Sequence, residues 1–407
     1  MRRTWGTHSG PRKFKQYFFF ASTCLLALAA FLGRRSSAVR VQSSFAQPAL
    51  PLKTHVFLAT SSADLRPLFV AVNSTLTTFG DLSKLRIVIF LPPSVGPAAR
   101  SSFVRLLPHA VDIISIDTTS LNVDMITNLP GVLPTKHTKR KELADPYNFA
   151  PFYISEMRKY ASLSKVIYLD TDVVVRRDLV DLLRQCCEQG TVAAVVEDCS
   201  QHLATYINKG RLKDNIARMV GAVRSEDERL LSADGLHREC VFNRGVVVLD
   251  IGSWNRMGIT RNIEAWMRAN LLSEEPLYSQ GVSQPPFLLA LLHRYTKLGF
   301  EWNTRGLGRD VISEGEINLL LKNGMEREYL TAVGLTQHPL HKGKTPFISP
   351  FTDQAFILHF NGKHKPWLHG RQTNDLASVC GSAKVPCSTL WWEHLSSEAE
   401  SLLAPLA

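Results

Sequence analysis

The stretch Lys165-Val-Ile-Tyr-Leu-Asp-Thr-Asp-Val-Val-Val175 decides the fold of this chain. Its apolar, β-branched start predicts a buried strand over Val166–Leu169, which ends at Asp170 and Asp172. Side chains alternate along a strand, so two carboxylates at i and i+2 share one face. Such neighbours repel each other and cost desolvation energy unless a cation joins them. A divalent ion that carries a diphosphate is the simplest such cation. In the alternative interpretation, one aspartate caps the next turn and the other is solvated.

The surrounding sequence alternates between strand and helix patterns. Strand patterns cover His55–Ala59, Leu85–Leu91 and Val111–Ile116, and helix patterns cover Leu68–Leu76, Pro97–Leu107 and Pro151–Tyr160. This alternation predicts an α/β fold with a mainly parallel sheet covered by helices. In open sheets of this class, ligands bind beyond the carboxyl ends of strands. A nucleotide is therefore expected near Ala59–Ser62 and the Asp-Thr-Asp, although the Ser/Thr run also suits a helix cap.

A second motif, Ile357-Leu-His-Phe-Asn-Gly-Lys-His-Lys-Pro-Trp367, lies near the C-terminus. His359 offers a neutral nitrogen ligand, Gly362 lets the backbone approach an anion closely, and Lys365 offers an ammonium group to phosphate. Together with the Asp-Thr-Asp, this motif resembles glycosyltransferase family 8. The resemblance extends from about His55 to Trp392.

Three further segments are similar to the same family. The strand-like Cys240-Val-Phe-Asn-Arg-Gly-Val-Val-Val-Leu-Asp250 resembles its F-N-x-G element, and Trp254 and Trp266 fall where its W…W-M pattern would. Two of these segments are similar to the galacturonosyltransferase-like branch of plants and algae. They are Gln284-Pro-Pro-Phe-Leu-Leu289 and Trp302-Asn-Thr-Arg-Gly-Leu-Gly308. The resemblance implies a GT-A-like fold that binds a nucleotide sugar, and a role in Golgi polysaccharide synthesis.

The resemblance also implies a metal-dependent transfer that retains the anomeric configuration. Asp170, Asp172 and His359 would hold Mn²⁺ or Mg²⁺ against the diphosphate of a UDP-sugar, and mixed carboxylate and imidazole ligands favour Mn²⁺. Lys365 would add a second positive charge beside the departing UDP. The implied donor-binding set also contains Ala59, Thr60, Thr171 and Gly362. The residues implied near the reacting sugar are Glu197, Asp198, Asn243 and Gln284, although Glu197 and Asp198 also suit a strand-end surface turn.

Two segments depart from the family pattern. The family often has an arginine after the alanine of N-Y-A-R, where this chain has Asn148-Phe-Ala-Pro151, and many relatives carry D-Q-D where it has Ser283-Gln-Pro-Pro286. The branch favours UDP-galacturonate as the donor, and a donor carboxylate in a closed pocket needs a compensating cation. Arg244 is the candidate cation. The alternatives are an Arg244 that points to solvent and a donor with another hexose or a pentose.

Three other functions compete with a hexosyltransferase. Asp-Thr-Asp-Val-Val also fits a phosphatase of the haloacid dehalogenase type, but that motif normally opens its domain, and no convincing acidic pair follows here. An inactive sugar-nucleotide-binding or scaffold protein would keep the fold and lose metal ligands, whereas all three are present. A nucleotide-sugar hydrolase is the third alternative, which only product analysis distinguishes.

The composition is that of a globular protein: the 407 residues are 45% hydrophobic and 20% charged. The net charge of +11 suggests nucleic acid at first sight. However, eight basic residues and no acidic ones lie within residues 1–40, so the remainder carries only +3. A nucleic-acid partner therefore loses its main support.

The N-terminus predicts a membrane anchor. Tyr17–Leu32 is apolar, with five basic residues before it and three after it, which favours a cytosolic N-terminus. We expect a cytosolic tail (1–16), a signal-anchor segment (17–33), a stem (34–52) and a catalytic domain (53–407) in the Golgi lumen, as in a single-pass type II membrane protein. A cleaved signal peptide is the alternative. The expected partners are the UDP-sugar, a glycan or polysaccharide acceptor and the membrane, with a homo- or hetero-oligomer left open.

Six of the seven cysteines follow the apolar segment, and an oxidising lumen would permit them to pair. Cys199 and Cys240 each lie beside a proposed site segment, and Cys380 and Cys387 enclose a short loop. The alternative for either pair is two buried free thiols. The adjacent pair Cys186-Cys187 is predicted to lie on a helix as apolar filler. The basic run Lys136–Lys141 is interpreted as a solvated loop or as a contact for an acidic glycan acceptor.

Overall fold

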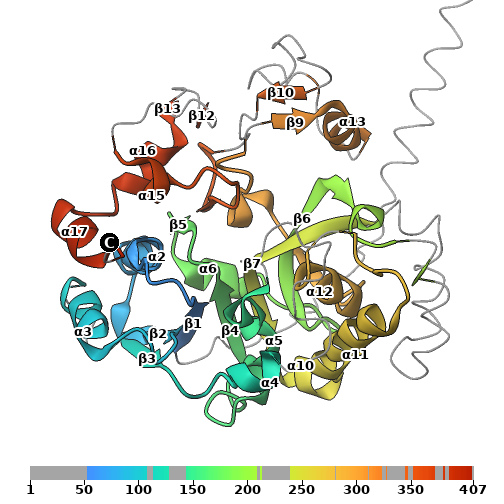
Figure 1. Ribbon diagram of the computed structural model, residues 1–407, viewed down its shortest axis with the longest axis horizontal. Coiled ribbons are helices and arrows are strands. Elements are labelled where there is room, and N and C mark those ends of the chain that lie inside the picture. The colour runs from blue at the N-terminus through green and yellow to red at the C-terminus, as the bar shows by residue number, and fades with distance from the viewer. Residues whose placement is uncertain are drawn as a thin grey trace, which may run out of the picture. The chain divides into compact units, whose positions relative to one another are not determined.

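The computed structural model describes residues 53–107, 113–127, 144–208, 239–279, 281–309, 311–322, 352–371 and 385–405, with short pieces at 211–212, 327, 344–346 and 379–380. Within these residues a seven-stranded sheet lies at the centre, in the order β3-β2-β1-β4-β7-β6-β8 (Figure 1). Its strands are β1 (Thr54–Ala59), β2 (Leu85–Phe90), β3 (Ile114–Asp117), β4 (Lys165–Leu169), β6 (Ala193–His202), β7 (Cys240–Asp250) and β8 (Tyr295–Leu298).

The sheet is mixed but mostly parallel, as the sequence predicted. Strand β7 runs antiparallel to its neighbours β4 and β6, and the other pairings in this described sheet are parallel. The carboxyl ends of β1, β4 and β6 therefore meet the beginning of β7 at one edge of the sheet. This edge carries the candidate site.

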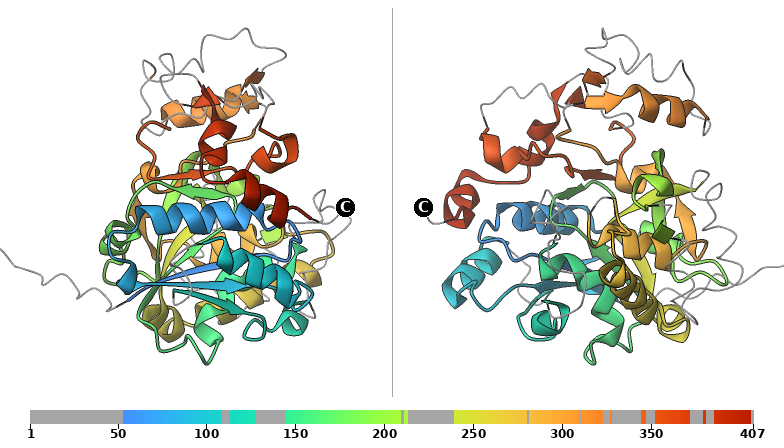
Figure 2. Two further views of the ribbon diagram at one scale, coloured as in Figure 1. Left: turned by 90° about the vertical axis from the view of Figure 1, so that its left-hand side faces the viewer. Right: turned by 45° about the vertical axis from the view of Figure 1, so that its right-hand side comes forward.

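Helices cover both faces of the sheet. One face is covered by α2 (Arg66–Thr78) and α3 (Pro97–Arg105), and the other by α10 (Ile251–Arg256), α11 (Ile259–Leu272) and α12 (Gln284–Ala290) (Figure 2). Along β1, Val56 and Leu58 pack into the hydrophobic cluster on the face covered by α2 and α3. Phe57 packs into the cluster on the face covered by α10, α11 and α12. Both faces of the strand are buried, which explains why the strands read as unbroken apolar runs.

A two-stranded antiparallel pair lies beside the main sheet. It joins β5 (Val173–Val175) to β11 (Ile357–His359), and their register sets His359 opposite Val173. This pairing brings the C-terminal motif next to the Asp-Thr-Asp that immediately precedes β5. Two shorter pairs join β9 (Val311–Ser313) to β10 (Lys344–Pro346) and β12 (Val379–Cys380) to β13 (Val385–Pro386).

The remaining described helices are short. They are α4 (Val123–Thr127), α6 (Leu179–Arg184), α13 (Glu314–Lys322), α15 (Pro366–His369), α16 (Cys387–Trp392) and α17 (Ser397–Leu403), with 3-10 turns η1 (Leu82–Lys84), η5 (Leu203–Thr205) and η6 (Phe300–Asn303). The C-terminal segment packs back against the start of the domain, since Leu65 N donates to Leu403 O at 3.1 Å.

The helix expected over Pro151–Tyr160 is wrong in extent. The structure has only α5 (Ala150–Tyr153), between the 3-10 turns η3 (Pro146–Phe149) and η4 (Ile154–Glu156). Pro146 and Pro151 each stand in the first turn of a new element, because proline lacks the N–H that a continuing helix needs. The strand expected over Val111–Ile116 is observed as β3, three residues later; residues 111–112 lie outside the described part.

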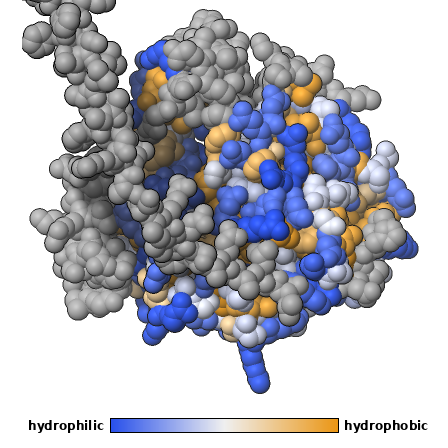
Figure 3. Space-filling model, turned by 180° about the vertical axis from the view of Figure 1, so that it is seen from behind, coloured by the Kyte–Doolittle hydropathy of each residue, from blue (hydrophilic) through white to orange (hydrophobic). Residues whose placement is uncertain are grey.

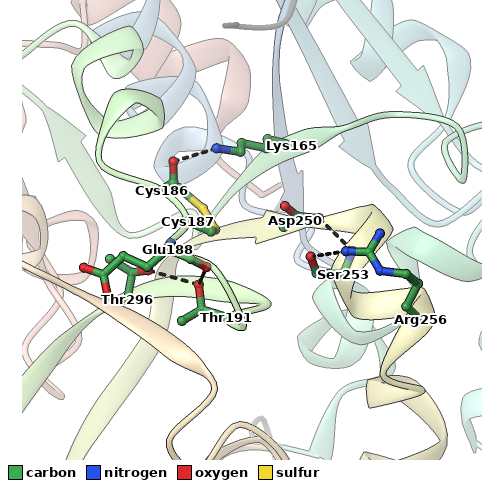
Figure 4. The surroundings of a disulfide bond; sticks show 9 residues. All are labelled: Lys165, Cys186, Cys187, Glu188, Thr191, Asp250, Ser253, Arg256 and Thr296. Atoms are coloured by element: carbon green, nitrogen blue, oxygen red, sulfur yellow. Dashed lines mark hydrogen bonds between the residues drawn. A yellow bond between two sulfur atoms is a disulfide. The ribbon is translucent and has the colours of Figure 1, made fainter. Parts of the chain in front are cut away.

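The prediction that Cys186 and Cys187 lie on a helix is also wrong. Helix α6 ends at Arg184, and the two cysteines follow it, bonded to each other as a disulfide (Figure 4). Lys165 Nζ donates to Cys186 O at 2.6 Å, so this carbonyl is satisfied from β4 rather than by a continuing helix. The Cys199–Cys240 and Cys380–Cys387 pairs are disulfides as well.

Several predictions fall outside the described residues: the cytosolic tail, the signal anchor, the stem and the basic run Lys136–Lys141. In the described part of the chain, no helix combines the length and the apolar character that crossing a membrane requires. The face of the molecule seen in Figure 3 is largely hydrophilic, and apolar side chains appear there in small separate areas.

Asp117, at the end of β3, yields a stability prediction. Its carboxylate accepts hydrogen bonds from Tyr160 Oη at 2.6 Å, Ser120 N at 2.8 Å and Thr119 N at 3.0 Å. Burial alone raises the pKa of Asp117, but these donors outweigh it and hold the pKa well below the ordinary 3.8. The charged form therefore stabilises the fold above about pH 4, and this contribution is lost as the pH falls toward the lowered pKa.

We expect Asp117→Asn to lower the free energy of unfolding by about 1–3 kcal/mol at pH 7, measured by urea denaturation. The difference from the wild type should shrink steadily below pH 4, because the wild-type carboxyl then becomes neutral too. Tyr160→Phe, which removes a single donor from the carboxylate, serves as the graded control and should cost less. A difference that stays constant down to pH 2 would contradict this account.

Candidate active site

A cavity of about 990 Å³ opens at the edge of the sheet where β1 and β4 end and β7 begins. Its described lining includes the segments after β1 and β4, the residues before α5, part of β6, the start of β7, the residues before α12, the segment around Arg305 and the C-terminal motif. Both sequence motifs reach it: it is lined by Asp170, Thr171, Asp172, His359 and Lys365.

The two aspartates and the histidine form one cluster. Candidate ligand atoms of Asp170, Asp172 and His359 all lie within 4.8 Å of one another. His359 Nε2 lies 3.1 Å from Asp172 Oδ1 and 3.9 Å from Asp170 Oδ2. The structure thus brings together the three residues that the sequence grouped, although residues 170 and 359 are far apart along the chain.

The donor set of this cluster fits a divalent cation. Asn303 Nδ2 donates to Asn243 O at 3.4 Å, which directs Asn303 Oδ1 toward His359 Nδ1, at 2.9 Å. His359 Nδ1 then carries the proton, and the lone pair of Nε2 faces the carboxylates. Nε2 and Asp172 Oδ1 are buried and have no hydrogen-bond partner. A lone pair that faces a carboxylate is unfavourable unless a cation lies between them, and carboxylate with imidazole is a common ligand set for Mn²⁺.

Lys365 is the positive group closest to Asp172. Its Nζ lies 2.7 Å from Asp172 Oδ2 and also contacts Phe360 O. Burial by itself raises the pKa of Asp172, but the ammonium group of Lys365 reverses this effect and holds the pKa far below its ordinary value. Asp172 is therefore charged at any physiological pH, as a metal ligand must be.

Gly245 gives the cluster its space. A Cβ on this residue would overlap the ring of His359 and lie 2.7 Å from Asp170 Oδ2. The same residue accepts from Asp170 N at 2.8 Å through its carbonyl, and its N–H donates to Asn243 Oδ1 at 2.8 Å. The Asn-x-Gly pattern thus has a physical reason: the asparagine side chain holds the N–H of Gly245 within β7, and the glycine makes room for two side chains of the cluster.

The adjacent carboxylates of β6 face different surroundings. Asp198 lines the cavity, pairs with Arg305 and accepts from Ser200 Oγ at 2.6 Å. Glu197 instead accepts from Tyr295 Oη at 2.7 Å and pairs with Lys297 at 3.0 Å. Glu197 is absent from the described cavity lining, as alternation along a strand requires when its neighbour lines it. A catalytic role for Glu197 stays a prediction that this placement does not support.

Asn243 and Gln284 both line the cavity. Gln284 opens α12 and donates from Nε2 to Phe242 O, so its side chain is tied to β7. Pro285 and Pro286 follow in the first helical turn, where a missing N–H costs nothing. Catalytic roles for Asn243 and Gln284 stay predictions.

Ala59 and Thr60 line the cavity after β1, as expected for the nucleotide side. Thr60 Oγ1 accepts from Ser62 N at 3.1 Å, so this hydroxyl also stabilises its own turn. Gly362 is not part of the described lining. A Cβ there would clash with the backbone of Gly308, so the observed reason for this glycine is the close packing of two loops rather than an approach to an anion.

Sequence reasoning missed several residues of the cavity: Asp145, Tyr147, Asn148, Arg305, Asn361 and Trp367. The hydroxyl of Ser61 contacts Asp145, which joins the segment after β1 to the segment before α5. Sequence reasoning also missed Asn303, whose side chain orients the ring of His359. Asn303 and Arg305 lie in the quoted Trp302–Gly308 segment, so their position in a family-like motif was the available signal.

Arg244 lines the cavity and is only 7% exposed, so the solvent-pointing alternative is wrong. Its Nη1 lies 3.8 Å from Asp170 Oδ1. Pro151, which stands where the family often has arginine, is buried in α5 and is not among the described lining residues. Helix α5 therefore contributes no positive side chain to the described lining of the cavity in place of the family's arginine.

The geometry around Gly245 predicts that even one methyl group disrupts the cluster. Gly245→Ala should weaken Mn²⁺ binding by more than about tenfold, because His359 and Asp170 must both move. Electron paramagnetic resonance of free Mn²⁺ during a titration measures this affinity. Gly96→Ala is the matched control, since no atom lies within 4 Å of the added Cβ. A folded Gly245→Ala protein with wild-type affinity would refute the assignment of the cluster as the metal site.

Comparisons with known proteins identify the family of this chain. The family model described as "Glycosyl transferase family 8" matches residues 55–370. "Glycosyltransferase 8 domain-containing protein 1" of Xenopus laevis is 30% identical over 230 residues, which are 56% of this chain and 53% of the relative. "Glycosyltransferase 8 domain-containing protein 2" of Homo sapiens is 29% identical over 263 residues, or 63% of this chain and 64% of the relative. The chain thus spans between about half and two thirds of the length of these curated relatives.

A solved structure shares the fold. The structure described as "WbbM bifunctional glycosytransferase apo structure" superposes with a TM-score of 0.50 at 15% identity, and the match covers 87% of this chain and 52% of that one. This likeness supports a GT-A-like α/β fold. Because the family model covers residues 55–370, which include the Asp-Thr-Asp, the Asn-Arg-Gly turn and the His-x-x-Gly-x-x-Lys motif, this chain belongs to glycosyltransferase family 8.

Proposed function

We propose that this protein is a metal-dependent, retaining glycosyltransferase that moves a sugar from a UDP-sugar to a glycan or polysaccharide acceptor. The observation that carries the proposal is the cluster of Asp170, Asp172 and His359, with Lys365 beside it, in the cavity of a family 8 domain. The three ligands, the orphaned lone pairs and the nearby ammonium suit a divalent ion bound to a diphosphate.

Each residue of the cluster has a distinct task in this proposal. A bound Mn²⁺ or Mg²⁺ supplies a Lewis acid that stabilises the negative charge of the departing UDP. Asp170 and Asp172 hold the ion by their charges, and Asn303 keeps the Nε2 lone pair of His359 aimed at it. Lys365, whose Nζ lies 2.7 Å from Asp172 Oδ2, would pair with a phosphate oxygen of the donor. These groups make the diphosphate a better leaving group without a proton transfer.

An inactive sugar-nucleotide-binding protein is the competing function. Loss of activity in a family usually removes ligands of the cation, whereas here all three are present and close together. The buried orphan atoms of His359 and Asp172 would only cost stability if no cation ever bound. These observations favour an enzyme over an inactive binding protein. The proposed reaction is hexosyl transfer, and galacturonosyl transfer is the specific form proposed within that class.

Metal dependence is the direct test. Chelation with EDTA should abolish UDP release from UDP-sugars, and Mn²⁺ should restore it. Asp172→Asn should lower the rate by more than about a hundredfold, because it removes ligand charge worth several kcal/mol at nearly constant volume. Asp181→Asn, a surface carboxylate on α6 that pairs with Arg177, is the matched control. Full activity in EDTA or in Asp172→Asn would overturn the metal assignment, and release of free sugar without glycan product would indicate a hydrolase.

We further propose that the catalytic domain lies in the Golgi lumen, anchored by the apolar N-terminal segment as a type II membrane protein. The basic residues that precede Tyr17 and the Cys199–Cys240 and Cys380–Cys387 disulfides support an oxidising, lumenal location. The sequon Asn73-Ser-Thr75 does not report on this location, because Asn73 Nδ2 donates to His394 O at 3.0 Å and the neighbouring side chains of α2 are buried.

A tag at the C-terminus tests the orientation. In sealed Golgi vesicles the tag should resist added protease, and detergent should make it sensitive, because the membrane separates the two compartments. A cytosolic tag on a known type II protein in the same vesicles is the control. Digestion of the C-terminal tag without detergent would contradict the proposed topology.

A further inference from the structure

Each aspartate of the metal cluster has its own positive partner within the protein. Lys365 Nζ lies 2.7 Å from Asp172 Oδ2. Arg244 Nη1 lies 3.8 Å from Asp170 Oδ1. The hydroxyl of Tyr168 is hydrogen-bonded to both members of this second pair, and it stays neutral because burial raises its pKa. Two carboxylates therefore face two cations.

These two pairs are largely shielded from water. The side chains of Lys365 and Asp172 are 16% and 18% exposed. Arg244 is 8% exposed, and Asp170, at 25%, is the most open of the four. Charges in such surroundings act on one another more strongly than they do in bulk water, and salt screens them less. With the neutral imidazole of His359, the charges of the cluster and its two cations sum to zero.

The other charged side chains of the described cavity lining are engaged elsewhere. Asp198 pairs with Arg305 on the side of β6, and Asp145 accepts from the hydroxyl of Ser61 after β1. The two cations beside the cluster are therefore the ones that a metal ion would face.

A divalent ion that entered this cluster alone would add an unbalanced double charge next to two fixed cations. The repulsion opposes binding, because like charges at short range in a shielded site are costly. A diphosphate removes this penalty, since its negative charge neutralises the ion and its oxygens accept from the ammonium of Lys365. Ion and diphosphate should therefore strengthen each other's binding by the same factor.

We propose that Lys365 and Arg244 disfavour a free divalent cation and favour the same cation together with a nucleoside diphosphate. This inference rests on the proposed function of the site and adds an opposing role to Lys365. The ammonium that would pair with a phosphate oxygen also repels the metal ion when no phosphate accompanies it. The site thus distinguishes a free ion from a nucleotide-bound ion by charge, which the three ligands alone would not do.

A single substitution with opposite effects on the two ligands tests the proposal. Lys365→Met removes the charge at similar side-chain length. It should tighten the binding of Mn²⁺ alone by about tenfold, measured by electron paramagnetic resonance of free Mn²⁺ without nucleotide. The same variant should weaken the binding of UDP in saturating Mn²⁺ by about tenfold or more, measured by calorimetry. Both titrations use the full-length chain purified in mild detergent.

Three further variants complete the comparison. Arg244→Met should also tighten the binding of Mn²⁺ alone, by a smaller factor, because its distance from Asp170 is longer. Lys365→Arg keeps the charge and should leave the Mn²⁺ affinity within about twofold of the wild type. Lys84→Met is the matched control, since this exposed lysine pairs with Asp81 on the surface, and it should change neither affinity.

Unchanged or weaker Mn²⁺ binding by folded Lys365→Met or Arg244→Met protein would overturn the proposal, because that cation would then support the cluster rather than oppose a free ion. An unchanged UDP affinity in Lys365→Met would overturn it as well. If the wild type does not bind UDP in saturating Mn²⁺, the proposed function fails. That outcome is distinct from a failure of the roles assigned to the two cations, which the Mn²⁺ titrations without nucleotide decide.

Discussion

The repulsion between the carboxylates of Asp170 and Asp172 is the constraint on which the site depends. A buried strand delivers both to the edge of the sheet, where burial by itself raises the pKa of Asp172. Positive or polarisable groups from two separate segments lie beside them: Lys365 and His359 from the C-terminal motif, and Arg244 from β7. The charges that line the cavity would therefore be compensated if a cation and an anionic ligand bound together.

Backbone pairing, rather than side-chain contact, brings these groups into range. The β5–β11 ladder sets His359 opposite Val173, and Phe360 N donates to Asp172 O at 2.8 Å. The C-terminal motif is thereby held directly against the Asp-Thr-Asp by hydrogen bonds that no ligand needs to supply. Preorganisation of this kind lowers the cost of ordering the site when a donor binds.

The F-N-R-G segment connects the metal cluster to the sugar side of the cavity. Asn243 holds the N–H of Gly245, Gly245 leaves room for the side chains of His359 and Asp170, and Arg244 between them lines the cavity as a buried cation. One short segment of β7 therefore contributes both to the geometry of the cluster and to the lining of the cavity. The Cys199–Cys240 disulfide ties the start of this strand to the end of β6, which keeps Asp198 and Asn243 on the same rim.

The sequence by itself determined the class of the fold and identified the three residues of the cluster. Unbroken apolar strands indicated a sheet buried on both faces. The two aspartates lie in the turn between β4 and β5, so strand alternation does not set their directions, and the tertiary structure does. Tertiary structure decided the rest. A register shift between β6 and β7, between Val195 and Glu197, set which of Glu197 and Asp198 faces the cavity, and a one-residue slip reverses that choice. The burial of Arg244 and the orientation of His359 by Asn303 depend on packing between segments far apart in sequence, which no local pattern encodes.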